Sequence, residues 1–245
     1  MYEELKTIID NSDNIVFFGG AGVSTESGIP DFRSEKGLYS AITEYGLPPE
    51  EIISASFFYK DPKTFFDYYK KNLVALWAKP NPAHLALAKL EQQGKLKAVV
   101  TQNIDGLHQA AGSQNIFELH GSVQRNTCLK CGRHYGLDYV MDPNNCRDGI
   151  PVCSCGGIIK PDVVLYEENL DEDCIRGAVR AISRADVLIV GGTSLVVYPA
   201  AGFLGYFRGS KLVVLNMSET GADQDADLVI RDPIGKVLEE CVLKA

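Results

Sequence analysis

The sequence predicts an α/β protein built on a doubly wound parallel sheet, with a smaller lobe attached to it. Short, continuously apolar runs alternate with helix-like stretches, as is typical of a parallel sheet covered on both faces. Glycine or polar residues follow several of these runs, where an open sheet builds its ligand-binding crevice. Two further stretches break the alternation. We therefore predict a Rossmann-like sheet and a smaller second lobe.

The expected strands and helices follow from the same alternation. Residues 81–94 are expected to form a helix, with Asn81 as cap, Pro82 in the first turn and Gly94 as the stop. Residues 171–185 have an amphipathic helical pattern, and residues 233–245 form a closing helix. The expected strands are residues 14–18, 96–101, 115–120, 162–166, 186–192, 211–216 and 227–230.

The two stretches that break the alternation predict the division into domains. Residues 31–76 follow a glycine turn as a long insertion and end in an aromatic-rich segment. Residues 121–160 lack apolar periodicity and are rich in cysteine. We expect a loop and helical insertion over 31–76 and a zinc-binding module over 121–160. The sheet domain is then discontinuous, over residues 1–30, 77–120 and 161–245.

The composition limits the class of partner and the compartment. The chain has 245 residues, 45% of them hydrophobic, with 24 basic against 32 acidic side chains and a net charge of −8. This balance argues against a nucleic-acid-binding or membrane-surface protein, because both need clustered positive charge. The first residues lack the basic and apolar regions of a signal peptide. With 7 cysteines and no such signal, we expect a reducing compartment, by default the cytoplasm.

Two short cysteine pairs predict a metal site. Cys128 and Cys131 form one pair, Cys153 and Cys155 form another, and a glycine follows each pair. Glycine lets backbone amides turn toward thiolates, and four thiolates suit tetrahedral zinc with no open position, so the metal should be structural. The second pair is one residue shorter than is usual. Cys146, or more remotely His134, is an alternative fourth ligand, while Cys174 and Cys241 lie on helical patterns and are expected to be bystanders.

A glycine turn after the first strand predicts nucleotide binding but not hydride transfer. Gly20 and Gly22 permit a close backbone approach to a pyrophosphate. The third glycine of the dinucleotide fingerprint is replaced by Thr25, and no acidic residue ends a directly following second strand. Taken alone, these two glycines are explained nearly as well by a tight turn that binds no ligand.

Polar residues at two strand ends are the candidate catalytic groups. Gln102, Asn103 and Asp105 come directly after a buried run, although Asp105 is also placed to cap the next helix. His120 ends another run before Gly121, where a histidine can act as a general base near neutral pH. His84 and His108 lie on helical patterns and are expected to be structural.

Together these motifs resemble the sirtuin family of NAD-dependent protein lysine deacylases, in its bacterial type. The resemblance covers residues of about 15–235, in family order and spacing. It is carried by the residues GAGVSTESGIPDFR at 20–33, TQNID at 101–105, HG at 120–121, the two cysteine pairs, GTSL at 192–195, VYPA at 197–200 and LN at 215–216.

The resemblance implies a reaction and residue roles. NAD is a co-substrate, acetyl-lysine passes its acetyl group to ADP-ribose, and nicotinamide and O-acetyl-ADP-ribose are released. His120 is the general base, Asn103 acts where nicotinamide is expelled, and Phe32 shields the ribose from water. The implied NAD-binding residues are Gly20, Ala21, Gly22, Thr25, Asp31, Phe32, Arg33, Gln102, Asn103, Ile104, Asp105, His120, Gly192, Thr193, Ser194, Asn216 and Ile234.

The resemblance also implies how a substrate protein is held. Two segments are expected to clamp the acetylated peptide as an added strand. They are Val163, Val164, Leu165 and Tyr166 on one side, and Leu195, Val196, Val197 and Tyr198 on the other. Tyr69 and Asn72 align with a Tyr-x-x-Arg pair of the desuccinylating branch, and without the arginine we expect uncharged acyl groups to be preferred. Protein ADP-ribosylation and NAD hydrolysis are alternatives that use the same site, and nicotinamide is an expected inhibitor.

Overall fold

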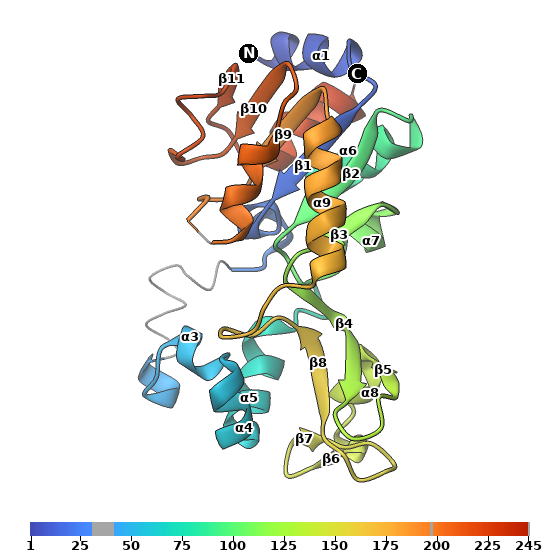
Figure 1. Cartoon of the computed structure of the whole chain (residues 1–245), viewed down its shortest axis with the longest axis vertical. Helices are drawn as coiled ribbons and strands as arrows, with labels where there is room; N and C mark the ends of the chain where they lie inside the picture. The colour runs from blue at the N-terminus through green and yellow to red at the C-terminus, as the bar shows by residue number, and fades with distance from the viewer. Residues whose placement is uncertain (31–41, 197, 245) are drawn as a thin grey trace.

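A six-stranded parallel sheet forms the centre of the larger lobe (Figure 1). The structure is a computed structural model, and it describes residues 1–30, 42–196 and 198–244. The strand order is β11-β10-β9-β1-β2-β3. The bounds are β1 Ile15–Gly19, β2 Leu96–Thr101, β3 Ile116–Glu118, β9 Val187–Gly191, β10 Lys211–Leu215 and β11 Leu228–Ile230.

Helices cover both faces of this sheet, as continuous apolar strands require. All five residues of β1 are buried, and so are all five of β9. One core lies under α1, α6 and the C-terminal turns, and the other under α9 and η5. The bounds are α1 Tyr2–Asp10, α6 Pro82–Gln92, α7 Leu107–Ala111, α9 Glu172–Arg184, η5 Ala200–Tyr206, α10 Ile234–Leu238 and η6 Glu239–Leu243.

The smaller lobe hangs below the parallel sheet in Figure 1 and has two parts. Its helical part packs aromatic rings, with Phe58, Phe65 and Phe66 meeting edge to face. The helical bounds are α3 Pro49–Ile52, α4 Ala55–Lys60, α5 Pro62–Tyr68 and the π-helical turn η3 Tyr69–Leu73. The cysteine-rich part contains β4 Gly121–Cys128, β5 His134–Gly136, α8 Leu137–Met141, η4 Pro143–Asn145, β6 Cys146–Arg147, β7 Ile150–Pro151 and β8 Ile159–Val163.

One expected strand lies elsewhere than predicted. The run at 162–166 was expected to be a strand of the main sheet, but β8 ends at Val163 and pairs antiparallel with β4 in the smaller lobe. Beyond Val163, the backbone N–H groups of Val164 and Tyr166 donate to carbonyls of separate loops, so no ladder continues. The apolar pattern at 162–166 is that of a buried segment, which sequence alone does not assign to a particular sheet.

The helix signals in the sequence are confirmed at α6. Asn81 is the cap, with the backbone N–H of Ala83 donating to its side-chain oxygen, and Pro82 is the first helical residue. The helix ends at Gln92, just before Gly94, whose φ is +74°. Within the described part of the chain no helix could cross a bilayer; the longest, α9, has 13 residues, against about 20 for a span.

Candidate active site

The candidate site lies where the order of strands reverses. β1 pairs with β2 on one side and with β9 on the other, and the chain continues outward from β1 in both directions. An open α/β sheet binds its ligands at such a switch point, outside the carboxyl ends of the strands. The turn after β1 carries Gly20 and Gly22, and the turn after β9 carries Gly192 and Thr193.

These two turns pack backbone against backbone, which explains the glycines. The N–H of Gly22 donates to the carbonyl of Gly192 at 2.8 Å. A Cβ on Gly22 would lie 2.8 Å from the Gly192 Cα, and a Cβ on Gly192, at φ +58°, would lie 2.3 Å from the Val23 nitrogen. The glycines expected to admit a pyrophosphate are thus required first for the contact between the two turns.

Up to residue 30, where the described segment ends, no α-helix follows the glycine turn. Two 3₁₀ turns, η1 Ala21–Val23 and η2 Thr25–Ser27, stand where a dehydrogenase would begin its helix. The Thr25 hydroxyl donates to the Gly22 carbonyl at 2.9 Å and so closes the second turn onto the first. Asp31, Phe32 and Arg33, which were predicted to contact NAD, lie outside the described residues.

Gln102 connects the turn after β2 to the turn after β9. Its backbone N–H donates to the Gly19 carbonyl at 3.0 Å, and its side-chain Nε2 donates to the Thr193 hydroxyl oxygen at 3.1 Å. The same hydroxyl oxygen accepts from the Leu195 N–H at 3.2 Å, while Ser194 is exposed beside it. The predicted residues Gln102 and Thr193 therefore form one hydrogen-bonded unit across the switch point.

Asn103 and Asp105 are joined by a residue that sequence reasoning missed. Ser24, 1% exposed, accepts from the Asn103 side-chain amide at 3.0 Å and donates to an Asp105 carboxylate oxygen at 2.7 Å. Its place in the glycine turn was the only sequence signal for it. The other Asp105 oxygen accepts at 2.9 Å from the N–H of Leu107, the first residue of α7, although Gly106 and not Asp105 is the N-cap of that helix.

Burial opposes the charge of Asp105. Desolvation raises the pKa of its carboxyl above the usual range, and the hydrogen bonds from the Leu107 N–H and the Ser24 hydroxyl act in the opposite direction. Ile104, between the two polar residues, is tied by its carbonyl to the Val123 N–H at 3.0 Å and packs on the aromatic core of the smaller lobe. The segment 103–105 therefore bridges the two lobes.

His120 lies between β3 and β4 with its ring fixed by a backbone carbonyl. Its Nδ1 is 2.9 Å from the Gln102 carbonyl oxygen. A carbonyl only accepts, so this contact requires a proton on Nδ1; in the neutral form of the imidazole the lone pair then lies on Nε2. The His120 carbonyl in turn accepts from the Val164 N–H at 2.9 Å.

Gly121 allows the backbone to turn sharply after His120, which is what holds His120 in this position. Its φ is +74°, and a Cβ there would lie 1.9 Å from the Asp162 carbonyl oxygen. No other residue fits such a turn without displacing β8. The tight turn expected after His120 is confirmed.

The remaining predicted NAD residues lie further along the sheet. Asn216 follows β10, and its side-chain amide donates to the Ser218 carbonyl at 2.9 Å. Ile234 is only 4% exposed and belongs to the core, where a Cβ on Gly191 would touch it. The next N–H, of Gly235, donates to the Glu26 carboxylate at 2.6 Å, which links α10 to the glycine turn.

The two expected peptide-binding segments differ in their exposure and in how many of their backbone N–H groups are already used within the chain. Val163 and Leu165 are buried, and the N–H groups of Val164, Leu165 and Tyr166 already donate to His120, Glu168 and Ile53 within the chain. On the other side Val196 and Tyr198 are exposed by 67% and 78%, with Leu195 partly buried, and Val197 lies outside the described residues.

The four cysteines of the two pairs converge in the smaller lobe. Their sulfur atoms all lie within 4.8 Å of one another, with Cys128 Sγ 3.5 Å from Cys155 Sγ and Cys131 Sγ 3.6 Å from Cys153 Sγ. Four thiolates at the usual Zn–S bond length of about 2.3 Å have sulfurs about 3.8 Å apart, so the donor set fits tetrahedral zinc.

Neither alternative ligand is in this cluster. Cys146 Sγ lies 3.2 Å from the Lys70 ammonium, and a ring nitrogen of His134 lies 3.0 Å from the Thr127 hydroxyl oxygen. The Cys155 N–H and the Tyr135 hydroxyl lower the pKa of Cys153 to about 6, which favours the thiolate that binds zinc. The cluster is closed, which suits a structural metal.

The fold and the candidate site by themselves indicate a class of enzyme. A glycine crevice at the switch point of a doubly wound sheet, with polar side chains and a histidine from neighbouring strand ends, is typical of an enzyme that uses a dinucleotide. The cysteine cluster marks a subclass with a structural metal module.

Comparisons with known proteins identify the family. The Sir2 family model matches residues 20–199. A Clostridium perfringens protein named NAD-dependent protein deacetylase is 61% identical, covering 98% of this chain and 97% of that protein. A Clostridium acetobutylicum protein of the same name is 59% identical with the same coverage. A solved structure described as Sir2–p53 peptide–NAD+ is 38% identical with a TM-score of 0.86, covering 98% of this chain and 96% of that one. The chain belongs to the Sir2 family.

Proposed function

We propose that this chain is an NAD-dependent protein lysine deacetylase, which transfers the acetyl group of acetyl-lysine to ADP-ribose and releases nicotinamide. The observation that carries the proposal is the His120–Gln102 contact of 2.9 Å at the edge of the glycine crevice. It places an imidazole whose neutral form carries its lone pair on Nε2 at the strand ends where a dinucleotide binds. The relatives named NAD-dependent protein deacetylase, which match nearly the whole chain, support the same function.

The residues around the crevice have separate roles in binding NAD. The turns at Gly20–Gly22 and Gly192–Ser194 receive the phosphates and the adjoining ribose, because their small residues let a ligand approach the backbone at the switch point. The N–H groups of Gly22 and Gly192 are themselves used within the chain. Asn103 and Asp105, held together by Ser24, line the pocket for nicotinamide. Bound there, NAD supplies a glycosidic bond whose cleavage leaves an electrophilic ribose carbon.

The chemistry of this chain then centres on one proton. With the Nδ1 proton directed to the Gln102 carbonyl, the Nε2 of His120 takes a proton from a ribose hydroxyl. The imidazolium that forms keeps its Nδ1–H on the same carbonyl, so the ring does not have to reorient. Gly121 and the Val164 N–H hold the backbone of His120 in place while this happens.

The acetylated peptide is proposed to lie between the segments 163–166 and 195–198. Since three N–H groups of 164–166 are already used, we expect a bound peptide to obtain most of its main-chain donors from the second segment. For the acyl group, Tyr69 is fully buried against Phe65, and the Asn72 amide donates to the Tyr68 carbonyl. No guanidinium stands at Asn72 to pair with a succinyl carboxylate, which favours uncharged acyl groups.

Zinc held by Cys128, Cys131, Cys153 and Cys155 would be structural, since four thiolates leave no position for substrate. The metal would join β4 to the segment that leads into β8, and β8 ends beside Gly121. We also propose that the protein works in the cytoplasm, where free thiols persist, and that nicotinamide inhibits it as a product.

Mass spectrometry of a reaction with NAD and an acetyl-lysine peptide tests the proposal. We expect deacetylated peptide, nicotinamide and O-acetyl-ADP-ribose in equal amounts, and none of them without NAD. The His120→Ala variant should lose turnover but retain NAD binding. Nicotinamide release without deacetylation would instead indicate protein ADP-ribosylation or NAD hydrolysis at the same site. A succinyl-lysine peptide that turns over as efficiently as the acetyl one would contradict the acyl preference.

A further inference from the structure

A groove of about 410 Å³ lies at the opposite end of the parallel sheet from the candidate active site. It opens beside the amino ends of β1, β2 and β3, where Asn14 precedes β1 and Lys97 is near the start of β2. The C-terminal half of α9 forms its other wall. The catalytic candidates follow the carboxyl ends of the same strands, so the groove is a separate feature.

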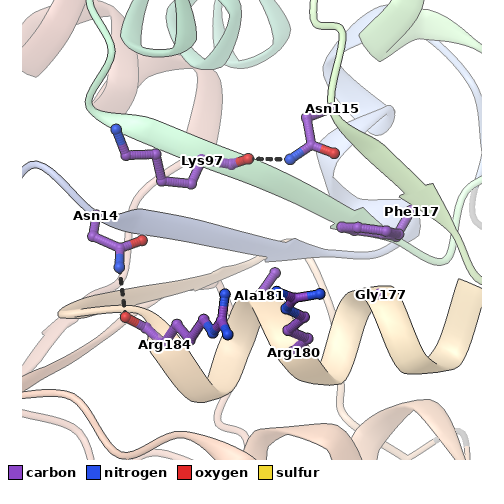
Figure 2. Close-up of a pocket in the computed structure, with 8 residues that line it drawn as sticks. All are labelled: Asn14, Lys97, Asn115, Phe117, Gly177, Arg180, Ala181 and Arg184. Carbon is purple, nitrogen blue, oxygen red and sulfur yellow. Dashed lines mark hydrogen bonds between the residues drawn. The ribbon is translucent and has the colours of Figure 1, made fainter.

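Three cations line the groove without a carboxylate partner. Figure 2 shows Arg180 and Arg184 extending from α9 toward the strands, while the Lys97 side chain on β2 directs its ammonium away from the two arginines. None of the three forms an ion pair with any residue in the ranges 1–30, 42–196 and 198–244. Arg176, one turn earlier on the same helix, pairs with Glu172 and Asp173. The three cations are thus gathered in one groove of a chain whose net charge is −8.

Neighbouring carboxylates are engaged elsewhere. Glu91 accepts from the backbone N–H groups of Gln114 and Asn115, and Glu118 pairs with Arg125. Neither Glu91 nor Glu118 is ion-paired with Arg180, Arg184 or Lys97. Lys97 donates one hydrogen bond, to the Gly94 carbonyl at 2.6 Å.

The floor of the groove is apolar and fixed. Phe117 lies against α9 at Gly177, where a Cβ would come within 2.2 Å of the ring. Ala181 and the alkyl stems of Arg180 and Arg184 continue this surface. The Asn14 amide ties the end of α9 to the sheet by donating to the Arg184 carbonyl at 2.5 Å. The groove thus combines a preformed apolar floor with cations along its walls.

The arrangement favours an extended anion over a compact one. Arg180 and Arg184 are separated by one helical turn, about 6 Å along the axis, so their charges are distributed along the groove. The groove lies at the C-terminal end of α9, whose carbonyls disfavour any anion, so its attraction for carboxylates comes from the side-chain cations, which are spaced for an extended ligand. Carboxylates spaced along a peptide can pair with each cation separately, while an apolar side chain covers Phe117.

We propose that this groove docks an acidic segment of a partner protein, in which aspartate or glutamate residues flank an aromatic or aliphatic side chain. The site is independent of the deacetylase reaction and would hold a partner while the crevice at the other end of the sheet remains accessible. Arg184 also complements the dipole of α9, which is the role it would have without a partner.

The test is binding of a fluorescein-labelled peptide in which aspartate and glutamate flank phenylalanine and leucine. We expect saturable binding that weakens with added salt. The double variant Arg180→Gln/Arg184→Gln should bind about tenfold more weakly, as expected from the loss of two exposed charge pairs. Ala181→Glu, which places a carboxylate in the groove, should reduce binding as well.

A matched control lies on the same helix. Arg176→Gln removes an arginine outside the groove and should not change binding. Unchanged thermal unfolding of all variants excludes misfolding as the cause of any loss. Equal binding by the double variant and the wild type would overturn the proposal. Displacement of the peptide by inorganic phosphate or ADP at lower concentrations than by an unlabelled acidic peptide would make the groove a small-anion site and equally refute it.

Discussion

The Gln102 carbonyl oxygen lies 2.9 Å from Nδ1 of His120, so the segment after β2 determines the tautomer of the histidine after β3. Gln102 also donates through Nε2 to Thr193 in the turn after β9. One residue therefore orients the candidate base and connects the two sides of the crevice. Both contacts are made at adjacent strand ends, which the parallel order β9-β1-β2-β3 brings together.

Gly121→Ala should displace His120 and destabilise the fold. A left-handed φ costs a non-glycine residue about 1–2 kcal/mol, and the new Cβ would lie 1.9 Å from the Asp162 carbonyl oxygen. We expect the free energy of unfolding to fall by about 3 kcal/mol or more, with most of the activity lost. Urea unfolding and steady-state turnover measure the two effects. Gly136→Ala is the control, because no atom lies within 4 Å of a Cβ there; equal stability of the two variants would contradict the role of the turn.

Ser24→Ala should impair turnover more than stability. The hydroxyl joins Asn103 to Asp105, and its loss leaves two partly buried polar groups without that partner. A loss of about 1–3 kcal/mol corresponds to a reduction in kcat/KM for NAD of about fivefold to 150-fold. Kinetics at varied NAD concentrations provide the measurement.

Ser27→Ala is the matched control for Ser24, since Ser27 lies in the same pair of turns but accepts from Asn81 instead. If both variants lose kcat/KM to the same extent, Ser24 acts only through the fold of the turn. Recovery of activity in Ser24→Thr, which restores the hydroxyl, would support the positioning role.

Substitution of different cysteines should affect zinc binding differently. Metal analysis should give about one zinc per chain, lost together with stability in Cys131→Ser and retained in Cys146→Ser. The reason is geometric, because Cys146 Sγ contacts Lys70 and lies outside the cluster of four sulfurs. Loss of zinc in the Cys146 variant, with retention in a Cys155→Ser variant, would reverse the assignment of the fourth ligand.

Local chemistry was more predictable from sequence than long-range pairing. The cysteine pairs, the glycine turns and the polar strand ends carry their signal within a few residues, and the structure brings them together as expected. The sequence did not show that β8 pairs with β4 rather than with the main sheet, because a buried strand has the same apolar pattern in either place.

The role of Ser24 could not be predicted from the sequence for a related reason. Its contacts to Asn103 and Asp105 span 79 and 81 residues, and an isolated serine in a turn has no periodicity that reveals them. The groove beside α9 is of the same kind, since Lys97, Phe117 and Arg180 meet only after three segments have packed. Such sites depend on topology, which residue patterns specify less directly than chemistry.

Two buried histidines predict a loss of stability in mild acid. His84 and His108 lie with ring centroids 4.7 Å apart, and burial lowers the pKa of His84 to about 4 and, together with the charge of His84, that of His108 to about 3. In the unfolded chain both have a pKa of about 6.5, so below that pH the unfolded state binds more protons than the folded state. Stability is therefore complete above pH 6.5 and falls as the pH decreases toward 4.

Urea unfolding at pH 7 and pH 5 measures this slope. At pH 5 we expect each histidine to have cost about 2 kcal/mol, at about 1.4 kcal/mol per pH unit below 6.5. His108→Phe, which keeps a ring between His84 and Phe17, should remove about half of the slope. His134→Gln, on an exposed ring of the zinc module, is the control. A slope that is unchanged in the His108 variant would show that other groups, and not the buried pair, take up the protons on unfolding.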